Sequence, residues 1–302
     1  MASSASAAIG QSLSRGAPAM INVPRTEPGL VAAVTSHAVP TIARNWRRIL
    51  APHGVRIELS AVFTHQAPRV RFKSTHKVRA LCELADLLLV VDDEDTGRRR
   101  ASLIQAKMAS QRGTVKISRL QDKLQLDLFQ NWPIFDFEEP IYKLAKLNFH
   151  HGGPAAQCGR YGVIDRHWNG PPRSPDWSQM HPSNVPGKTA GSQTLADFIV
   201  RLVSGRAGRD ATLSLRTDWS KTVDALMTIT YARQFQHRAT LGAARFPRGN
   251  STTAYFLQDE LLQVSVTSTG LLAEDSLPEV VVVDGPPPHR ALSVLRIRVG
   301  GG

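Results

Sequence analysis

Three polar side chains near the middle of the first half of the chain have the types and spacing of a catalytic group. Asp86 precedes a run of apolar residues, and a second apolar run after the polar turn Asp95–Gly97 ends in Gln105 and Lys107. Because alternate residues of a strand point to the same side, Gln105 and Lys107 project from one face. A hairpin that turns near Thr96 predicts that Asp86 lies opposite Ala106 or Lys107. The sequence therefore predicts a carboxylate, an amide and an ammonium at one end of a buried hairpin.

These groups suit a metal ion that activates water at a phosphate. Mg²⁺ prefers oxygen ligands, which the Asp86 carboxylate, the Gln105 side-chain carbonyl and the Ala106 backbone carbonyl can supply. Glu83, three residues before Asp86, is close enough to join them. A bound metal polarises the phosphate and lowers the pKa of its water, and Lys107 can orient that water and stabilise the developing negative charge. We expect Mg²⁺ or Mn²⁺ to bind Asp86, Glu83, Gln105 and Ala106, and catalysis to use Asp86, Gln105, Lys107 and Glu83.

The arrangement resembles the PD-(D/E)XK nuclease superfamily, which has the restriction-endonuclease-like fold. Ala85-Asp86 stands where the family usually has Pro-Asp, and Gln105-Ala106-Lys107 stands where it usually has Asp or Glu, any residue, and Lys. Gln in place of the acid is a known variant in Mrr-like restriction enzymes, and this segment is most similar to that branch. The resemblance covers about residues 27–130. It implies a metal-dependent DNA endonuclease, with restriction or anti-phage defence as its setting.

Two other interpretations of these residues stay open. An ordinary hairpin can carry Asp86 and Lys107 as a cross-strand ion pair, which contributes under ~1 kcal/mol when exposed. A nuclease fold can also have lost catalysis, because Gln105 gives a metal one negative charge fewer than an acid would. The chain would then be a nucleic-acid-binding or partner-binding module. Gln121 and Gln125, four residues apart, are expected to face solvent, with a place beside the site as the alternative.

The elements that must position these side chains follow from the hydrophobic pattern. The chain predicts helical segments interrupted near Pro40, then strands and a helix in the order Val55–Thr64, Leu84–Val91, Ala101–Met108 and Ser118–Gln130, with Ser118 as the helix cap. Leu84–Val91 is nearly all apolar, which is typical of a strand buried on both faces. We expect an α/β fold (α+β over the whole chain), with a restriction-endonuclease-like mixed sheet flanked by helices in the N-terminal half.

Composition divides the rest of the chain. The first 25 residues are small, polar and free of acids, so we expect a disordered extension at 1–25. The nuclease-like core would span 26–150. The Gly- and Pro-rich stretch 151–191 would connect it to an α+β region at 192–302, either separate from the core or continuous with it. Beyond residue 150 we expect a strand at Tyr161–Asp165, helices at Thr194–Ser204 and Trp219–Gln236, and strands at Leu261–Thr267, Glu279–Val283 and Leu292–Val299.

The charge of the chain is unevenly distributed. Its 302 residues carry 37 Lys and Arg against 25 Asp and Glu, a net charge of +12. Residues 1–81 hold eleven basic and two acidic residues, so most of the excess lies just before the proposed site. Clustered cations bind phosphates by releasing counterions, although a basic surface also serves solubility. We expect DNA to bind an extended basic segment whose charges lie on one side: Arg69, Arg71, Lys73, Lys77 and Arg79.

Several classes of protein are excluded. The longest apolar runs fall far short of the ~20 residues that a membrane span needs, so we expect no membrane partner. Two cysteines cannot build a disulfide framework, which favours a reduced, cytoplasmic setting. The scattered His150, His151, Cys158 and His167 lack the paired spacing of a zinc site. The expected partners are DNA and either a further copy of the chain or a defence-system protein.

Overall fold

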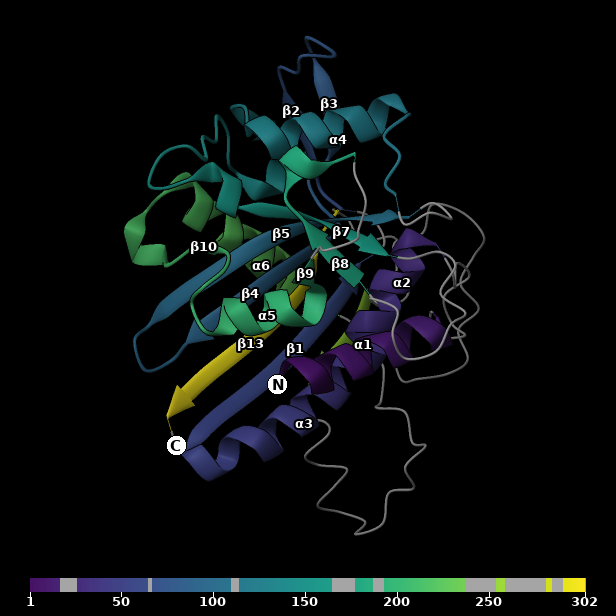
Figure 1. The fold of residues 1–302 in the computed structure, drawn as a ribbon. Helices are drawn as coiled ribbons and strands as arrows, with labels where there is room; N and C mark the ends of the chain where they lie inside the picture. Colours follow the sequence, from purple (N-terminus) through teal and green to yellow (C-terminus); the bar gives the residue numbers. More distant parts are fainter. Residues whose placement is uncertain are drawn as a thin grey trace.

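The computed structural model describes residues 1–16, 26–64, 67–109, 114–164, 177–186, 193–236, 254–258, 281–283 and 290–301. Over these residues it is a mixed α+β structure in which helices flank a large sheet of parallel and antiparallel strands (Figure 1). The expected α+β class, with a mixed sheet flanked by helices, is confirmed. The predicted strand Leu261–Thr267 lies outside the described residues, as does Asp165 at the end of another predicted strand.

The central sheet joins strands from distant parts of the chain. In spatial order these are β12 (Val281–Val283), β11 (Ala254–Gln258), β1 (Val55–Thr64), β13 (Ser293–Gly301), β4 (Leu87–Asp93), β5 (Arg98–Met108), β7 (Gly159–Ile164), β8 (Trp177–Met180) and β9 (Gln193–Thr194). The short strand β10 (Arg209–Asp210) also pairs with β5. β13 runs parallel to β4 and β7 parallel to β5, and the other pairs are antiparallel. Both faces are covered, which explains the apolar run that begins β4.

The last strand of the chain lies in the middle of this sheet. β13 inserts between β1 and β4 and pairs with both along most of its length (Figure 1). A boundary at residue 150 therefore does not divide the structure, and the described parts of 192–302 continue the core of 26–150. The stretch 151–191 is not only a connection, because it contributes β7 and β8 to the sheet.

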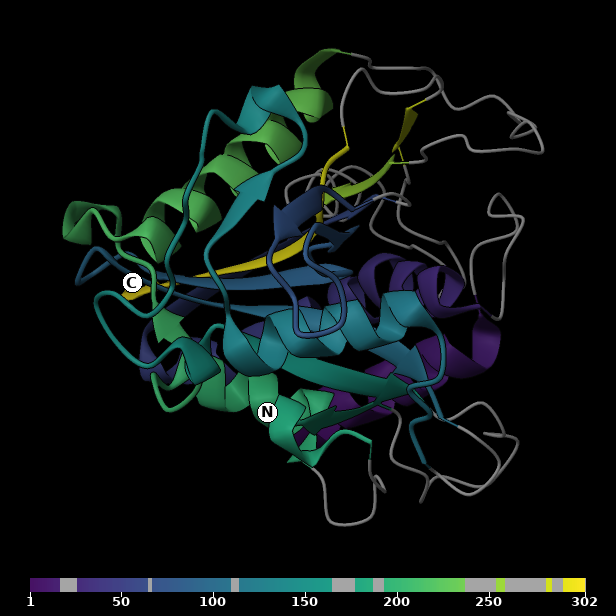
Figure 2. The same ribbon diagram turned by 90° about the horizontal axis from the view of Figure 1, so that it is seen from above.

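One face of the sheet is covered by four helices and a π-helical turn (Figures 1 and 2). They are α1 (Ala2–Arg15), α2 (Glu27–Ala33), the turn Val34–Ala38, α3 (Val39–Leu50) and α5 (Leu195–Val203). The interruption expected near Pro40 takes the form of this turn. Pro40 itself lies in the first turn of α3, where a helix tolerates the missing N–H.

Helix α1 replaces the disordered extension expected at 1–25. Ala5, Ala8 and Ile9 are buried in the core that α1 shares with α3 and α5. The Trp46 indole donates a hydrogen bond to the Met1 carbonyl, 3.1 Å away. Small side chains lower the hydrophobicity of this segment, which is why disorder was expected, but alanine also has the highest helix propensity. The expectation is wrong for Ala2–Arg15, and residues 17–25 lie outside the described residues.

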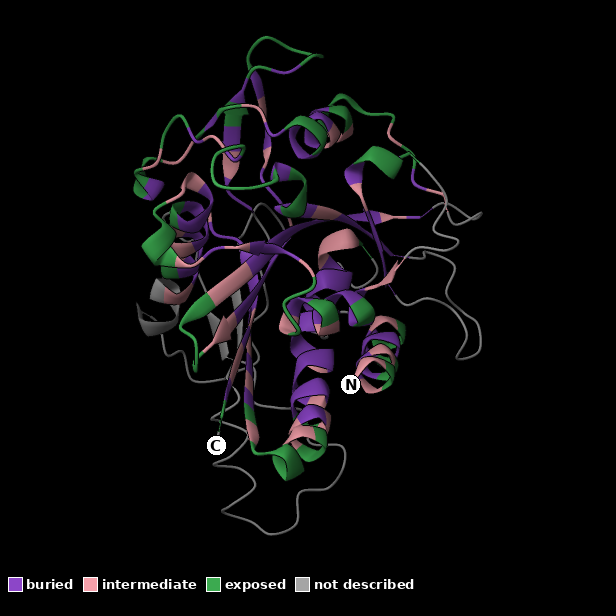
Figure 3. Cartoon of the chain, turned by 60° about the vertical axis from the view of Figure 1, so that its left-hand side comes forward, coloured by how far each residue is buried: buried purple, intermediate pink, exposed green. Residues whose placement is uncertain are grey.

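The opposite face carries α4 (Leu120–Asn131), α6 (Asp218–Gln236) and a small sheet in the order β3 (Ala80–Glu83), β2 (Arg69–Phe72), β6 (Phe135–Phe137). Short 3₁₀ turns lie at Ala51–His53, Pro140–Tyr142, Ala155–Gln157, Pro182–Asn184 and Leu213–Leu215. Figure 3 shows that the central strands are largely buried between the two layers. Ser118 does not cap α4, because the helix begins at Leu120 and the cap position is Arg119.

Candidate functional site

The β4–β5 hairpin places Asp86 opposite Gln105 rather than opposite Ala106 or Lys107. Leu87 pairs with Ile104, and the Asp86 N–H donates to the Ile104 carbonyl (2.9 Å). The expected register is wrong because the turn begins one residue earlier, at Glu94, with Asp93 paired to Arg98. The Asp93 carboxylate accepts the N–H groups of both Asp95 and Thr96 (3.1 Å each), which closes the turn one residue earlier.

The Asp86 carboxylate is bonded to the predicted partner segment. Gln105 Nε2 donates to Asp86 Oδ2, and the Ala106 N–H donates to the same oxygen at 2.6 Å. Burial raises the pKa of Asp86 to about 7; the positive charge of Lys107 opposes this, and the neighbouring carboxylates of Glu83 and Glu27 add to it. The three residues expected to act together at this point are therefore adjacent, and the carboxyl group titrates near neutrality.

Lys107 is nearly buried and lies among carboxylates from two helices. Its Nζ is 3.0 Å from Asp122 Oδ1 and 3.9 Å from Glu27 Oε2. Burial alone would lower the pKa of Lys107, but the charges of Glu27, Asp86 and Asp122 outweigh it and raise the pKa. Lys107 is thus held as a cation. The interpretation of an isolated cross-strand pair with Asp86 does not describe this geometry, because Lys107 bonds to the helices.

Glu27 and Asp122 belong to the site and were not predicted. Thr26 caps α2 by accepting the Gly29 N–H (3.5 Å), which puts Glu27 in the first turn of the helix. Glu27 Oε1 also accepts the Met108 N–H (2.9 Å), which ties α2 to the end of β5. One signal was present in the sequence, because Glu27 is one of only two acids in residues 1–81. Asp122 occupies the first turn of α4, a position that is common for acids and carries no signal of its own.

Glu83 reaches the site from the small sheet. It ends β3, opposite Arg69 of β2, and the next residue, Leu84, donates its N–H to the Pro68 carbonyl (2.8 Å). Burial raises the pKa of Glu83 against the opposing charges of Arg290, Lys107 and Arg69. The chain turns between Glu83 and Asp86, so the two carboxylates approach Lys107 from different sheets.

The donor atoms fit a hard cation that keeps much of its water. Gln105 Oε1 is buried and accepts no hydrogen bond from the described residues. Even-numbered residues of β5 direct their backbone groups toward β4, as Ile104 does. The Ala106 carbonyl therefore lies on the side of β5 that faces Asp86. No three His, Cys, Asp or Glu side chains of the described residues form a ready metal cage. Mg²⁺ needs no such cage, since it commonly uses one or two carboxylates and retains several waters.

The basic segment does not form the one-sided array expected from its spacing. Arg69 and Arg71 lie on the same side of β2, but both pair with Glu138, at 2.6 and 3.1 Å. The strand ends at Phe72 and the chain turns, with Asp127 of α4 accepting bonds from Ser74 and from the Thr75 N–H. The remaining cations, Lys73, Lys77 and Arg79, are exposed in the β2–β3 loop near α4. Only this loop offers the predicted surface for phosphates.

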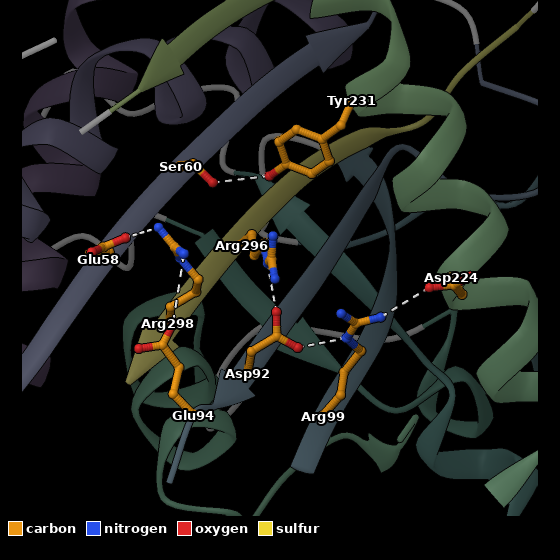
Figure 4. A network of polar contacts seen from close by, with 9 residues as sticks. All are labelled: Glu58, Ser60, Asp92, Glu94, Arg99, Asp224, Tyr231, Arg296 and Arg298. Atoms are coloured by element: carbon orange, nitrogen blue, oxygen red, sulfur yellow. Dashed lines mark hydrogen bonds and ion pairs between the residues drawn. The ribbon is translucent and has the colours of Figure 1, made fainter. Parts of the chain in front are cut away.

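A second polar cluster, at the other end of the sheet, is internally neutralised (Figure 4). Asp92 lies between Arg99 and Arg296, 2.6 Å from each. Arg298 pairs with Glu58 and, at 3.6 Å, with Glu94. These arginines contribute to the net charge of the chain, but each is bonded to a carboxylate. They add little to a phosphate-binding surface.

Comparisons with family models, curated proteins and solved structures found no match to the chain. Among the described residues, no helix is long and apolar enough to cross a membrane. The function must therefore be argued from the geometry of the site.

Proposed function

We propose that the chain is a metal-dependent endonuclease that hydrolyses phosphodiester bonds in DNA. The observation that supports it most is the convergence of Asp86, Gln105 and Lys107, with two further carboxylates, at the end of one buried hairpin. Titratable groups with raised pKa values that gather in this way are typical of functional sites. The resemblance of the segment to PD-(D/E)XK nucleases points to the same chemistry.

The residues have separate roles in this proposal. Asp86, the free Gln105 Oε1, the Ala106 carbonyl and Glu83 would hold Mg²⁺ or Mn²⁺. When bound, the ion would supply a water of lowered pKa and polarise the phosphate. Lys107, kept protonated by Glu27 and Asp122, would stabilise negative charge that develops on the phosphate. The exposed cations of the β2–β3 loop would attract the DNA backbone.

A second candidate is a nucleic-acid-binding or partner-binding module on a degenerate nuclease fold. It is favoured by the hydrogen bond from Gln105 Nε2 to Asp86, which satisfies the carboxylate without a metal. A cytoplasmic setting, a role in restriction or anti-phage defence, and a homo-oligomer or a defence-system partner belong to the leading proposal. They rest on the resemblance and on two cysteines that are both free thiols.

Cleavage of plasmid DNA tests the proposal. The wild type should convert supercoiled DNA to nicked or linear forms with Mg²⁺ or Mn²⁺, and EDTA should stop it. Asp86→Ala and Lys107→Ala should each slow the reaction by at least about a hundredfold, since Asp86 would hold the metal and Lys107 would stabilise the charge of the transition state. Lys116→Ala, at an exposed lysine, is the control. A wild type that cuts no faster than the two site variants would overturn the proposal, and salt-sensitive binding without cutting would support the second candidate.

A further inference from the structure

A cavity of about 500 Å³ lies beside the proposed active site, between β3 and the N-terminal half of α4. Glu83 forms part of its wall, so the cavity and the site share a carboxylate. The volume falls within the roughly 300–1,000 Å³ of sites that bind small organic groups.

The wall of the cavity contains an amide that lacks a partner. Gln125 of α4 was expected to face solvent, but only 6% of its surface is exposed. Its Oε1 is buried and accepts no hydrogen bond from the described residues. A buried acceptor without a partner is unfavourable, and because Gln125 lines the cavity, a rotation of its amide would let this oxygen bond to a group that enters.

The rest of the wall combines apolar and cationic side chains. Leu81, Leu120 and Leu124 offer apolar contacts, while Arg69, Lys77 and Arg290 bring positive charge. Arg69 pairs with Glu138 and Arg290 with Glu139, whereas Lys77 has no ion pair among the described residues. The first turn of α4 also reaches the cavity, and no side chain caps its N–H groups.

A nucleotide has the chemistry that this wall would recognise. Its base presents apolar faces and an edge that both donates and accepts hydrogen bonds, which an amide can match. Its phosphate suits an unpaired lysine and the N-terminal turn of a helix. A base stacked inside a duplex cannot enter a cavity, so the nucleotide must be unpaired.

We propose that this cavity binds one unpaired nucleotide of the DNA strand, next to the phosphate that the site would cut. The proposal deepens the proposed function, because it names the substrate as DNA with unpaired nucleotides: single-stranded tails, flaps or extruded bases. Glu83 would contribute both to binding the nucleotide and to holding the metal, since it borders the cavity and approaches Lys107.

Binding measured without cutting tests this proposal apart from the nuclease activity. Lys107→Ala should bind a fluorescent duplex with single-stranded tails about tenfold more tightly than the same duplex with blunt ends, by anisotropy in Mg²⁺. Adding Gln125→Leu should remove most of this preference. Adding Lys77→Ala, in an exposed loop where folding is not at risk, should weaken binding of the tailed DNA severalfold. Gln157→Leu, at an exposed amide outside the cavity, is the matched control.

Each outcome decides one of the two proposals. Equal affinity for tailed and blunt DNA would overturn the nucleotide site, even if the wild type cuts plasmids. Tight binding of a free deoxynucleoside monophosphate without any preference among the DNAs would overturn its assignment to the substrate strand. A preference for tails that depends on Gln125 and Lys77, in a protein that cuts nothing, would support the nucleotide site and overturn the nuclease proposal.

Discussion

Asp86→Asn should make the protein more stable at pH 8 while abolishing the proposed metal site. In the folded protein burial raises the pKa of Asp86 from 3.8 to about 7. Between these values the folded state holds a proton that the unfolded state has released, so the free energy of unfolding falls as the pH rises. Asparagine removes this titration.

The size of this change in stability follows from the difference in the pKa of Asp86 between the folded and unfolded states. Each unit of pKa difference corresponds to about 1.4 kcal/mol, so ionising Asp86 costs the wild type about 3 kcal/mol between pH 5 and pH 8. Most of this loss occurs below pH 7, where the folded carboxyl group still holds its proton and the unfolded one has released it. The stability of Asp86→Asn relative to the wild type should therefore increase by a similar amount between pH 5 and pH 8.

Urea unfolding at both pH values measures this difference. Comparing the variant with the wild type cancels the titration of the other carboxyl groups. Asp136→Asn, at an exposed carboxylate on β6, controls for the removal of one acid. If the stability of Asp86→Asn relative to the wild type is the same at pH 5 and pH 8, then Asp86 is not desolvated as the structure places it.

Three further predictions concern the metal, the lysine and the N-terminal helix. Because Asp86 must be deprotonated to bind a metal, the affinity for Mn²⁺ should fall about tenfold per pH unit below pH 7 and level off above it. Calorimetry should show proton release when Mn²⁺ binds at pH 6, and an affinity that does not change with pH would contradict the role of Asp86. Glu27→Gln should lower the pKa of Lys107 and move the alkaline limb of the cleavage profile to lower pH, whereas an unmoved limb would mean that Glu27 does not act through Lys107. Ile9→Ala should cost roughly 2–5 kcal/mol in unfolding experiments because Ile9 is 1% exposed, and a cost near zero would show that α1 does not pack on the core.

The hairpin could be predicted from sequence because its signals are local. The apolar runs, the polar turn and the spacing of Gln105 and Lys107 all lie within about twenty residues. The register differed by at least one residue because the Asp93 carboxylate closes the turn early, and hydrophobic alternation does not report that contact. Gln125 was expected to face solvent because polar side chains on a helix usually do. The cavity exists only where α4 packs against β3.

The rest of the site and fold depends on contacts between distant segments. Glu27 reaches Lys107 across eighty residues of chain, and it does so through a helix that packs against the end of β5. The sequence of β13 predicts an ordinary apolar strand. No residue within Ser293–Gly301 indicates that this strand enters the sheet between β1 and β4. Helix α1 was missed for a related reason, since its small side chains gain stability only from the helices beside them.

The two ends of β4 differ in their charge balance, and this difference is why we propose a cation at the Asp86 end and not at the Asp92 end. Around Asp92 two guanidinium groups face one carboxylate at hydrogen-bonding distance, so the charges there are already satisfied. Around Lys107 the balance of charge is reversed, because carboxylates from α2, α4 and the two sheets approach one ammonium. The raised pKa values of Asp86 and Glu83 record the cost of ionising both groups there. A divalent cation would offset that cost, and at a free concentration a hundred times its Kd it would stabilise the folded protein by about 2.7 kcal/mol. The gain should be largest above pH 7, where Asp86 is ionised and its charge is otherwise least compensated.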